Sequence, residues 1–134
     1  MVYIKKGDKK KRMIAVGKLV SISSNKKNGV KDEEAGQYIY IDLSIVDERQ
    51  QPEKWYNVRV YDVDMLKCPE LSKADGMLQT GQKPLVQMVY YESEKLARDI
   101  SNNPKVYINQ KANFRDLVKH FKIVPVLPQV QNIV

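Results

Sequence analysis

Two runs of the sequence alternate between aliphatic side chains and polar or aromatic ones. In Gln37–Asp47 every second residue is aliphatic, namely Ile39, Ile41, Leu43 and Ile45. In Lys54–Val63 the corresponding positions are Tyr56, Val58 and Val60. Successive side chains of a β-strand point to opposite faces, so a period of two predicts two strands that each bury one face. The chain is therefore expected to fold around a β-sheet.

The positions between the aliphatic residues place rings and one guanidinium on the opposite face of this predicted sheet. These residues are Tyr38, Tyr40, Trp55, Arg59 and Tyr61. Flat rings beside cations form the kind of surface on which the bases of a single nucleic-acid strand stack. Two alternatives stay open, since Tyr and Trp are enriched at protein interfaces and aromatic pairs also stabilise sheets by cross-strand packing.

The predicted elements follow the order of a small barrel. Three further strands are expected at Arg12–Ser23, Pro84–Glu92 and Lys105–Ala112. Gly17 predicts a bend in the first of them, a short helix is expected within Asp64–Gln79, and Ser93–Asn103 is interpreted as a polar loop with a helical turn. Three strands, a helical connection and two more strands is the order of an OB-fold. We expect an all-β fold with one or two short helices, arranged as a five-stranded OB-fold barrel.

Composition divides the chain into an arm, one domain and a tail. Residues 1–11 are expected to form a basic N-terminal arm, residues 12–122 the OB-fold domain, and residues 123–134 a C-terminal tail. The domain is expected to end in a helix at Asn113–Phe121, where apolar residues recur at helical spacing. This helix is expected to seal one mouth of the barrel, and the alternative is an oligomer contact. At 134 residues the chain is long enough for one real core.

The positive charge of the chain suits a polyanionic partner. There are 23 Lys and Arg against 16 Asp and Glu, which gives a formal charge of +7. The basic residues expected to contact phosphates are Lys10, Lys11 and Arg12 in or next to the arm, and Lys26 and Lys27 in the first long loop. Such residues displace the counterions condensed on a phosphate backbone. The alternative for the arm is a solubilising terminal segment.

Four segments in order resemble the single-stranded DNA-binding protein family over residues 12–112. They are Gly17-Lys18-Leu19, Tyr40–Ile45, Lys54–Val60 and Thr80–Met88. The resemblance implies an OB-fold that binds single strands across its second and third strands and its long loops. Bacterial members usually end in a tail with an acidic tip, whereas residues 125–134 contain no acidic residue. A divergent member, such as one encoded by a phage or mobile element, is therefore expected.

Catalysis has little support in the sequence. One histidine and one cysteine, Cys68, cannot form a zinc site, and no Walker-type phosphate loop is present. The acidic run that begins at Glu92 is similar to metal-dependent nuclease sites, which would need Asp42 or Asp62 as a second carboxylate. Such pairs arise easily in a highly charged chain. We expect no enzyme, no metal and no cofactor.

The expected function is sequence-tolerant binding of single-stranded DNA, which the protein would coat and protect during replication or recombination. RNA is an alternative ligand, because stacking does not distinguish the sugars. The alternative function is a protein–protein interaction or oligomeric accessory module that uses the same aromatic face. A homo-oligomer is expected. No apolar stretch reaches the roughly 20 residues of a membrane span and no signal peptide is recognisable, so a cytoplasmic location is expected.

Overall fold

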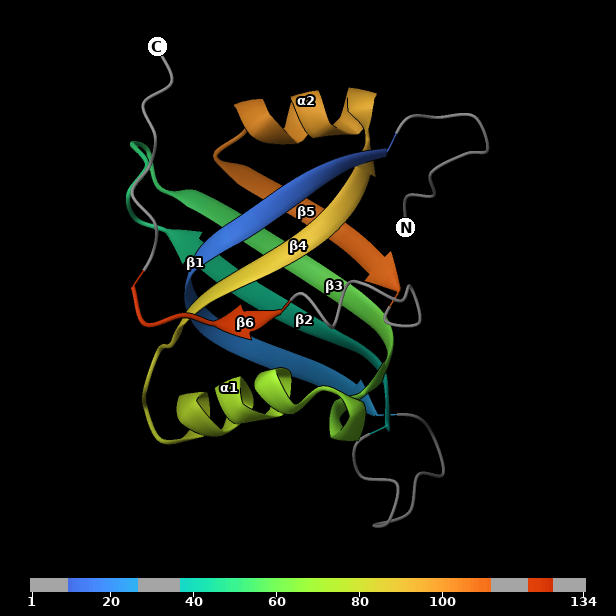
Figure 1. The fold of residues 1–134 in the computed structure, drawn as a ribbon, viewed down its shortest axis with the longest axis vertical. Coiled ribbons are helices and arrows are strands. Elements are labelled where there is room, and N and C mark those ends of the chain that lie inside the picture. Colours follow the sequence, from blue (N-terminus) through green and yellow to red (C-terminus); the bar gives the residue numbers. More distant parts are fainter. Residues whose placement is uncertain (1–9, 27–36, 112–120, 127–134) are drawn as a thin grey trace.

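Six strands form one curled sheet in the computed structural model, which describes residues 10–26, 37–111 and 121–126. The strand order is β5-β3-β2-β1-β4-β6 (Figure 1). The strands are β1 (Lys10–Lys26), β2 (Gln37–Asp47), β3 (Lys54–Asp64), β4 (Leu85–Ser93), β5 (Lys105–Lys111) and β6 (Lys122–Ile123). All neighbours pair antiparallel except β3 and β5, which are parallel. The predicted all-β character is confirmed, and five of these strands match predicted ones.

The long strand β1 belongs to both halves of the sheet. Its first half, up to Lys18, pairs with β4, and its second half, from Lys18 onward, pairs with β2. Between the halves, Gly17 has a φ of +150°, a conformation that only glycine adopts readily. A Cβ atom at this position would collide with the carbonyl oxygen of Val46 on β2. Gly17 therefore allows the bend predicted from the sequence and the close approach of two backbones.

Two helices cover opposite ends of the curled sheet (Figure 1). Helix α1 (Pro69–Gln79) follows β3 after a 3₁₀ turn, η2 (Met65–Lys67), and begins with a proline, whose missing N–H costs nothing there. Helix α2 (Glu94–Asn102) connects β4 to β5. The Ser93 hydroxyl caps α2 by accepting a hydrogen bond from the Leu96 N–H at 3.4 Å. The predicted polar loop with a helical turn is thus a nine-residue helix.

A buried lysine fastens α2 to the start of β3. The Lys54 ammonium donates hydrogen bonds to the carbonyl oxygens of Ile100 at 2.9 Å and Ser101 at 3.2 Å. Both acceptors lie in the last turn of α2, where unpaired carbonyls and the helix dipole attract a cation. Burial lowers the pKa of Lys54 below its ordinary value. The beginning of β3 is therefore positioned by a helix that follows it by about 40 residues.

The core lies inside the curl and takes one face of each strand. The predicted inward residues of β2 and β3 are buried, namely Ile41, Leu43, Ile45, Tyr56, Val58 and Val60. Tyr90 of β4 is fully buried, and so is Ala15 of β1. Helix α1 contributes Leu71 and Ala74 from below the sheet in Figure 1. The alternation in the sequence thus predicted the core residues of the two central strands correctly.

The C-terminal part of the described chain adds a short strand that the sequence did not indicate. β6 pairs with β4 at Val86 and Gln87. The helix predicted at Asn113–Phe121 lies outside the described residues except for Phe121, which is buried in the core.

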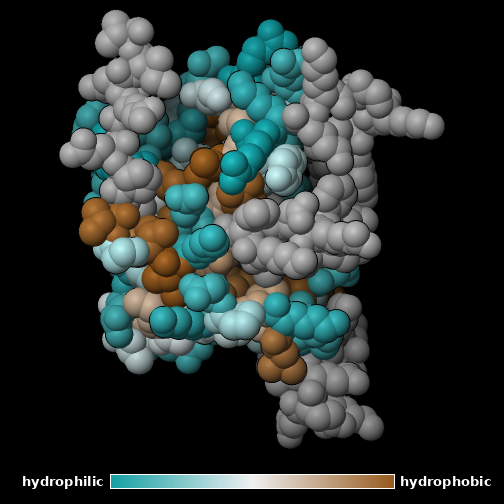
Figure 2. All heavy atoms as spheres, viewed as in Figure 1, coloured by the Kyte–Doolittle hydropathy of each residue, from teal (hydrophilic) through white to brown (hydrophobic). Residues whose placement is uncertain are grey.

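Figure 2 shows the side with β4 and β6 in front, where hydrophobic atoms gather mainly at the left of the view. No helix in the described part of the chain is long and apolar enough to cross a membrane.

Candidate functional site

The sheet register gathers aromatic and hydrogen-bonding side chains on the outer face of β2, β3 and β5. On β2 and β3, Tyr40 pairs with Tyr61 and Asp42 pairs with Arg59. On β5, Tyr107 lies beside Asn57 and Asn109 lies beside Arg59. We call this surface the outer face; it comprises Tyr40, Asp42, Ser44, Trp55, Asn57, Arg59, Tyr61, Tyr107 and Asn109. Each of these side chains is at least partly exposed, in contrast to the buried residues that alternate with them.

Tyr38 does not share this face, so that part of the prediction is wrong. Its ring packs against the hydrophobic core, opposite the fully buried Val63. The alternation reverses because Asp62 on β3 has a φ of +56° and the pairing of β2 with β1 shifts by one residue at the same level. The reversal leaves Ile39 38% exposed, although the pattern predicted that it would be buried.

Arg59 is held by two partners on the outer face. Its Nε and Nη2 donate to the two carboxylate oxygens of Asp42 at 2.8 and 2.9 Å, a bidentate ion pair. Its guanidinium carbon lies 4.0 Å from the centre of the Tyr40 ring. Tyr40 in turn meets Tyr61 edge to face, with ring centres 6.0 Å apart. Hydrogen bonding to Asp42 raises the pKa of Arg59 above its ordinary value, so the arginine is charged but its charge is balanced.

Three rings of the outer face, those of Trp55, Tyr61 and Tyr107, are at least partly exposed and could stack with bases. Trp55 and Tyr61 lie on the same face of β3, six residues and therefore about 20 Å apart. Tyr107 lies on the neighbouring strand β5 beside Asn57, which is between Trp55 and Tyr61 along β3. The exposed fraction of Tyr107 is 69%. Tyr107 is not among the residues predicted for this face. A signal was present, because Val106 and Ile108 on either side of it are apolar and buried.

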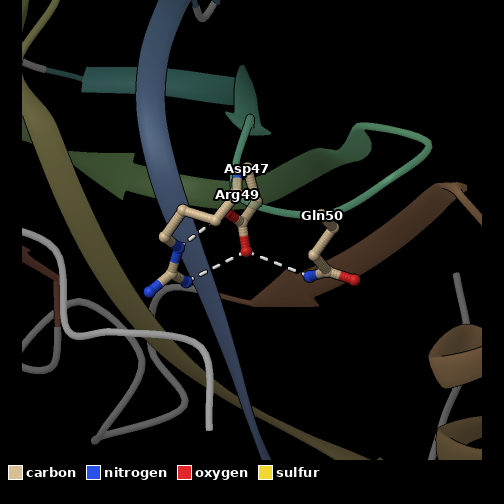
Figure 3. Close-up of polar contacts among 3 residues, drawn as sticks. All are labelled: Asp47, Arg49 and Gln50. Atoms are coloured by element: carbon tan, nitrogen blue, oxygen red, sulfur yellow. Dashed lines mark hydrogen bonds and ion pairs between the residues drawn. The ribbon is translucent and has the colours of Figure 1, made fainter. Parts of the chain in front are cut away.

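The turn before Trp55 is fixed by a buried carboxylate (Figure 3). Asp47, only 1% exposed at the end of β2, accepts bonds from the Arg49 guanidinium at 2.8 and 2.9 Å and from Gln50 Nε2 at 3.0 Å. It also accepts one from the backbone N–H of Arg49 at 3.1 Å. Burial alone would raise the pKa of Asp47, but these hydrogen bonds outweigh it and hold the pKa below its usual range. This network and Lys54 position the Trp55 end of the outer face from two sides.

No family model, curated protein or solved structure matches the chain. The function of the outer face is therefore inferred from its own geometry. Partly exposed rings about 20 Å apart on one strand can contact several successive bases, while the polar groups between them can form hydrogen bonds.

The predicted basic residues that the structure describes lie on β1 rather than on the strands of the outer face. β1 begins at Lys10, so Lys11 and Arg12 belong to a strand and lie opposite β4 residues in the half of β1 that pairs with β4. Both are exposed. Lys26 ends β1 opposite Tyr38, and Lys27 lies outside the described residues. Only the second half of β1 adjoins the outer face.

Glu92 and Asp42, two of the carboxylates considered for a nuclease site, lie in different surroundings. Glu92 is buried and accepts a hydrogen bond from Gln110 Nε2 at 3.3 Å, whereas Asp42 is paired with Arg59 on the outer face. Burial raises the pKa of Glu92, which disfavours the anion that a metal would require. No group of three His, Cys, Asp or Glu side chains in this part of the chain could hold a metal ion. Glu92 is therefore buried apart from Asp42, and the other candidate partner, Asp62, is exposed on β3.

Proposed function

We propose that this protein is a single-stranded DNA-binding protein with an OB-fold, which coats and protects single strands during replication or recombination in the cytoplasm. The observation that carries the proposal is the outer face, where an exposed ring, Tyr107, and two partly exposed rings, Trp55 and Tyr61, lie on two adjacent strands. Stacking on such rings is sequence-tolerant because every base has a π-face.

The connectivity of the sheet supports an OB-fold. This fold is a five-stranded, partly open Greek-key barrel that binds oligonucleotides on its second and third strands. Here β1 pairs with both β2 and β4, β5 joins β3 in parallel, and α1 lies between β3 and β4 in the chain. The outer face occupies β2, β3 and β5, and β2 and β3 are the strands that carry the ligand in this fold. Helix α2 and β6 are additions to that plan.

The charge distribution supports capture of the strand in two parts. Arg59 is balanced by Asp42, so the outer face itself contributes little net charge. The formal charge of +7 lies elsewhere, and Lys10, Lys11, Arg12, Lys26 and Lys27 supply part of it. We infer that this positive charge attracts the phosphates of the strand to the protein. If about five phosphates are contacted, log affinity falls with log salt at a slope of about −3.5.

Fluorescence of Trp55 tests the proposal directly, because it is the single tryptophan of the sequence. The protein is titrated with an oligothymidine of about 35 nucleotides at several salt concentrations. Saturable quenching that weakens with salt, together with much weaker quenching by a duplex of the same length, is the expected result. Unchanged fluorescence, combined with no binding in a gel-shift assay, would refute the proposal.

Two tyrosine substitutions locate the binding surface. Tyr61→Ala should weaken binding by about 5- to 150-fold, the equivalent of roughly 1–3 kcal/mol for one stacked base. Tyr91→Ala is the matched control, because Tyr91 is a half-exposed strand tyrosine on β4, away from the outer face. It should leave affinity within about twofold. Self-association that depends on Trp55, without DNA binding, would instead identify the outer face as a protein interface.

A further inference from the structure

A hollow lies in the middle of the outer face, where β2, β3 and β5 run side by side. Its volume is about 450 Å³, within the range of roughly 300–1,000 Å³ that is typical of small-ligand sites. The outward side chains that line it are Asp42, Ser44, Asn57, Arg59, Tyr107 and Asn109. The hollow therefore lies between the Trp55 end and the Tyr61 end of the face, along the path proposed for the strand.

The charged groups that line the hollow neutralise each other. Asp42 and Arg59 form the bidentate ion pair described above. A phosphate would have to compete with the Asp42 carboxylate for the guanidinium and would face repulsion from it. The hollow consequently suits an uncharged, flat group with hydrogen-bonding edges better than it suits the phosphate backbone.

Ser44 and Asn57 use their polar side-chain atoms in hydrogen bonds within the protein, whereas Asn109 has no part in those bonds. The Ser44 hydroxyl lies 3.3 Å from Asn57 Oδ1 in a hydrogen bond, and Asn57 Nδ2 donates to the carbonyl oxygen of Val106 at 3.4 Å. Asn109, by contrast, lines the hollow with a partly exposed side chain that takes no part in these hydrogen bonds. Its amide retains one acceptor and two donors for a ligand. It lies two residues along β5 from the exposed ring of Tyr107, on the same face.

We propose that this hollow binds one unstacked adenine base of the DNA strand. The Asn109 amide pairs with the adenine edge in the bidentate manner that Asn and Gln use for this base. The ring of Tyr107 stacks on the base. The inference rests on the proposed function and goes beyond it, because it adds one base-reading position to a surface that otherwise tolerates any sequence.

Short oligonucleotides that differ at one central base test this inference. Four labelled 11-mers of thymidine, with adenine, guanine, cytosine or thymine at the centre, are compared by fluorescence anisotropy. The adenine 11-mer should bind about tenfold more tightly than the all-thymine one, within the range expected for one bidentate base contact. In Asn109→Ala the ratio of the two affinities, adenine 11-mer against all-thymine 11-mer, should fall to about onefold.

Asn102→Ala, at the exposed end of α2, serves as the matched control and should keep the preference. A thermal unfolding curve of Asn109→Ala shows whether the fold of this variant is intact. Tyr107→Leu is a second test variant, which should weaken binding of the adenine 11-mer more than binding of the all-thymine strand. Equal binding of all four 11-mers by the native protein would overturn the adenine site and leave the proposed function standing. A preference for guanine or cytosine would overturn the assignment of the base. Failure of every oligonucleotide to bind would refute the proposed function itself, and the adenine site with it.

Discussion

Replacing Gly17 by alanine should destabilise the fold strongly, because two separate costs fall on the same residue. Its φ of +150° lies in a region that costs other residues about 1–3 kcal/mol. The added Cβ would also collide with the Val46 carbonyl oxygen and lie 2.9 Å from the Asp47 backbone nitrogen. Overpacking of this kind costs about 1–3 kcal/mol more. We expect a loss of about 3–5 kcal/mol in unfolding free energy and a fall in Tm of about 10 °C or more.

Two other glycines separate these costs in the same assay, thermal and urea unfolding followed by circular dichroism. Gly81 has a φ of +84° but open space around it, so Gly81→Ala carries only the conformational cost of about 1–2 kcal/mol. Gly76 lies within α1 with nothing near its Cβ position, so Gly76→Ala should stabilise the protein by about 0.5–1 kcal/mol. A loss in Gly17→Ala no larger than that in Gly81→Ala would refute the close approach of β1 to β2.

Three further substitutions test the charged groups. Asp47→Asn should lower the unfolding free energy by about 2 kcal/mol at pH 7. Because the pKa of Asp47 is depressed in the folded state, the difference in unfolding free energy between the native protein and the variant should shrink as the pH falls below about 4. A difference that stays constant with pH would contradict this. Burial raises the pKa of Glu92, so ionisation of this carboxyl lowers the stability of the fold as the pH rises. In urea unfolding, Glu92→Gln should therefore be more stable than the native protein at pH 7 but not at pH 4. Asp42→Asn should release Arg59, tighten binding of oligothymidine and steepen the salt slope by about 0.7, whereas Asp99→Asn on the exposed face of α2 should change neither.

The central strands were predictable because burial alone determines their pattern. A side chain on one face of β2 or β3 either enters the core or does not, and the sequence records this choice at every second position. Lys54 breaks the rule, since it is buried in an aliphatic position. Its partners are backbone carbonyls at the end of α2, which no local pattern can reveal.

The parts of the site that escaped prediction depend on register. Whether Tyr38 lies on the outer face depends on how β1 pairs with β2 and on the positive φ of Asp62. The charge of Arg59 is neutralised by Asp42 only because the two residues lie opposite each other on neighbouring strands. Neither relationship is encoded within a single strand. Tyr107 differs, because its own strand carried the alternation that identifies it.

The parallel pairing of β3 with β5 determines when the proposed binding surface comes into existence. Trp55 pairs with Lys105, 50 positions later, and the chain between them includes α1, β4 and α2. Contacts between such distant segments require a large loop to close and generally form late in folding. The hairpin of β2 and β3 is local and can form early, while the hollow is complete only when β5 docks. A partly folded chain, such as one emerging from the ribosome, would thus expose the rings of β2 and β3 before it possessed the hollow.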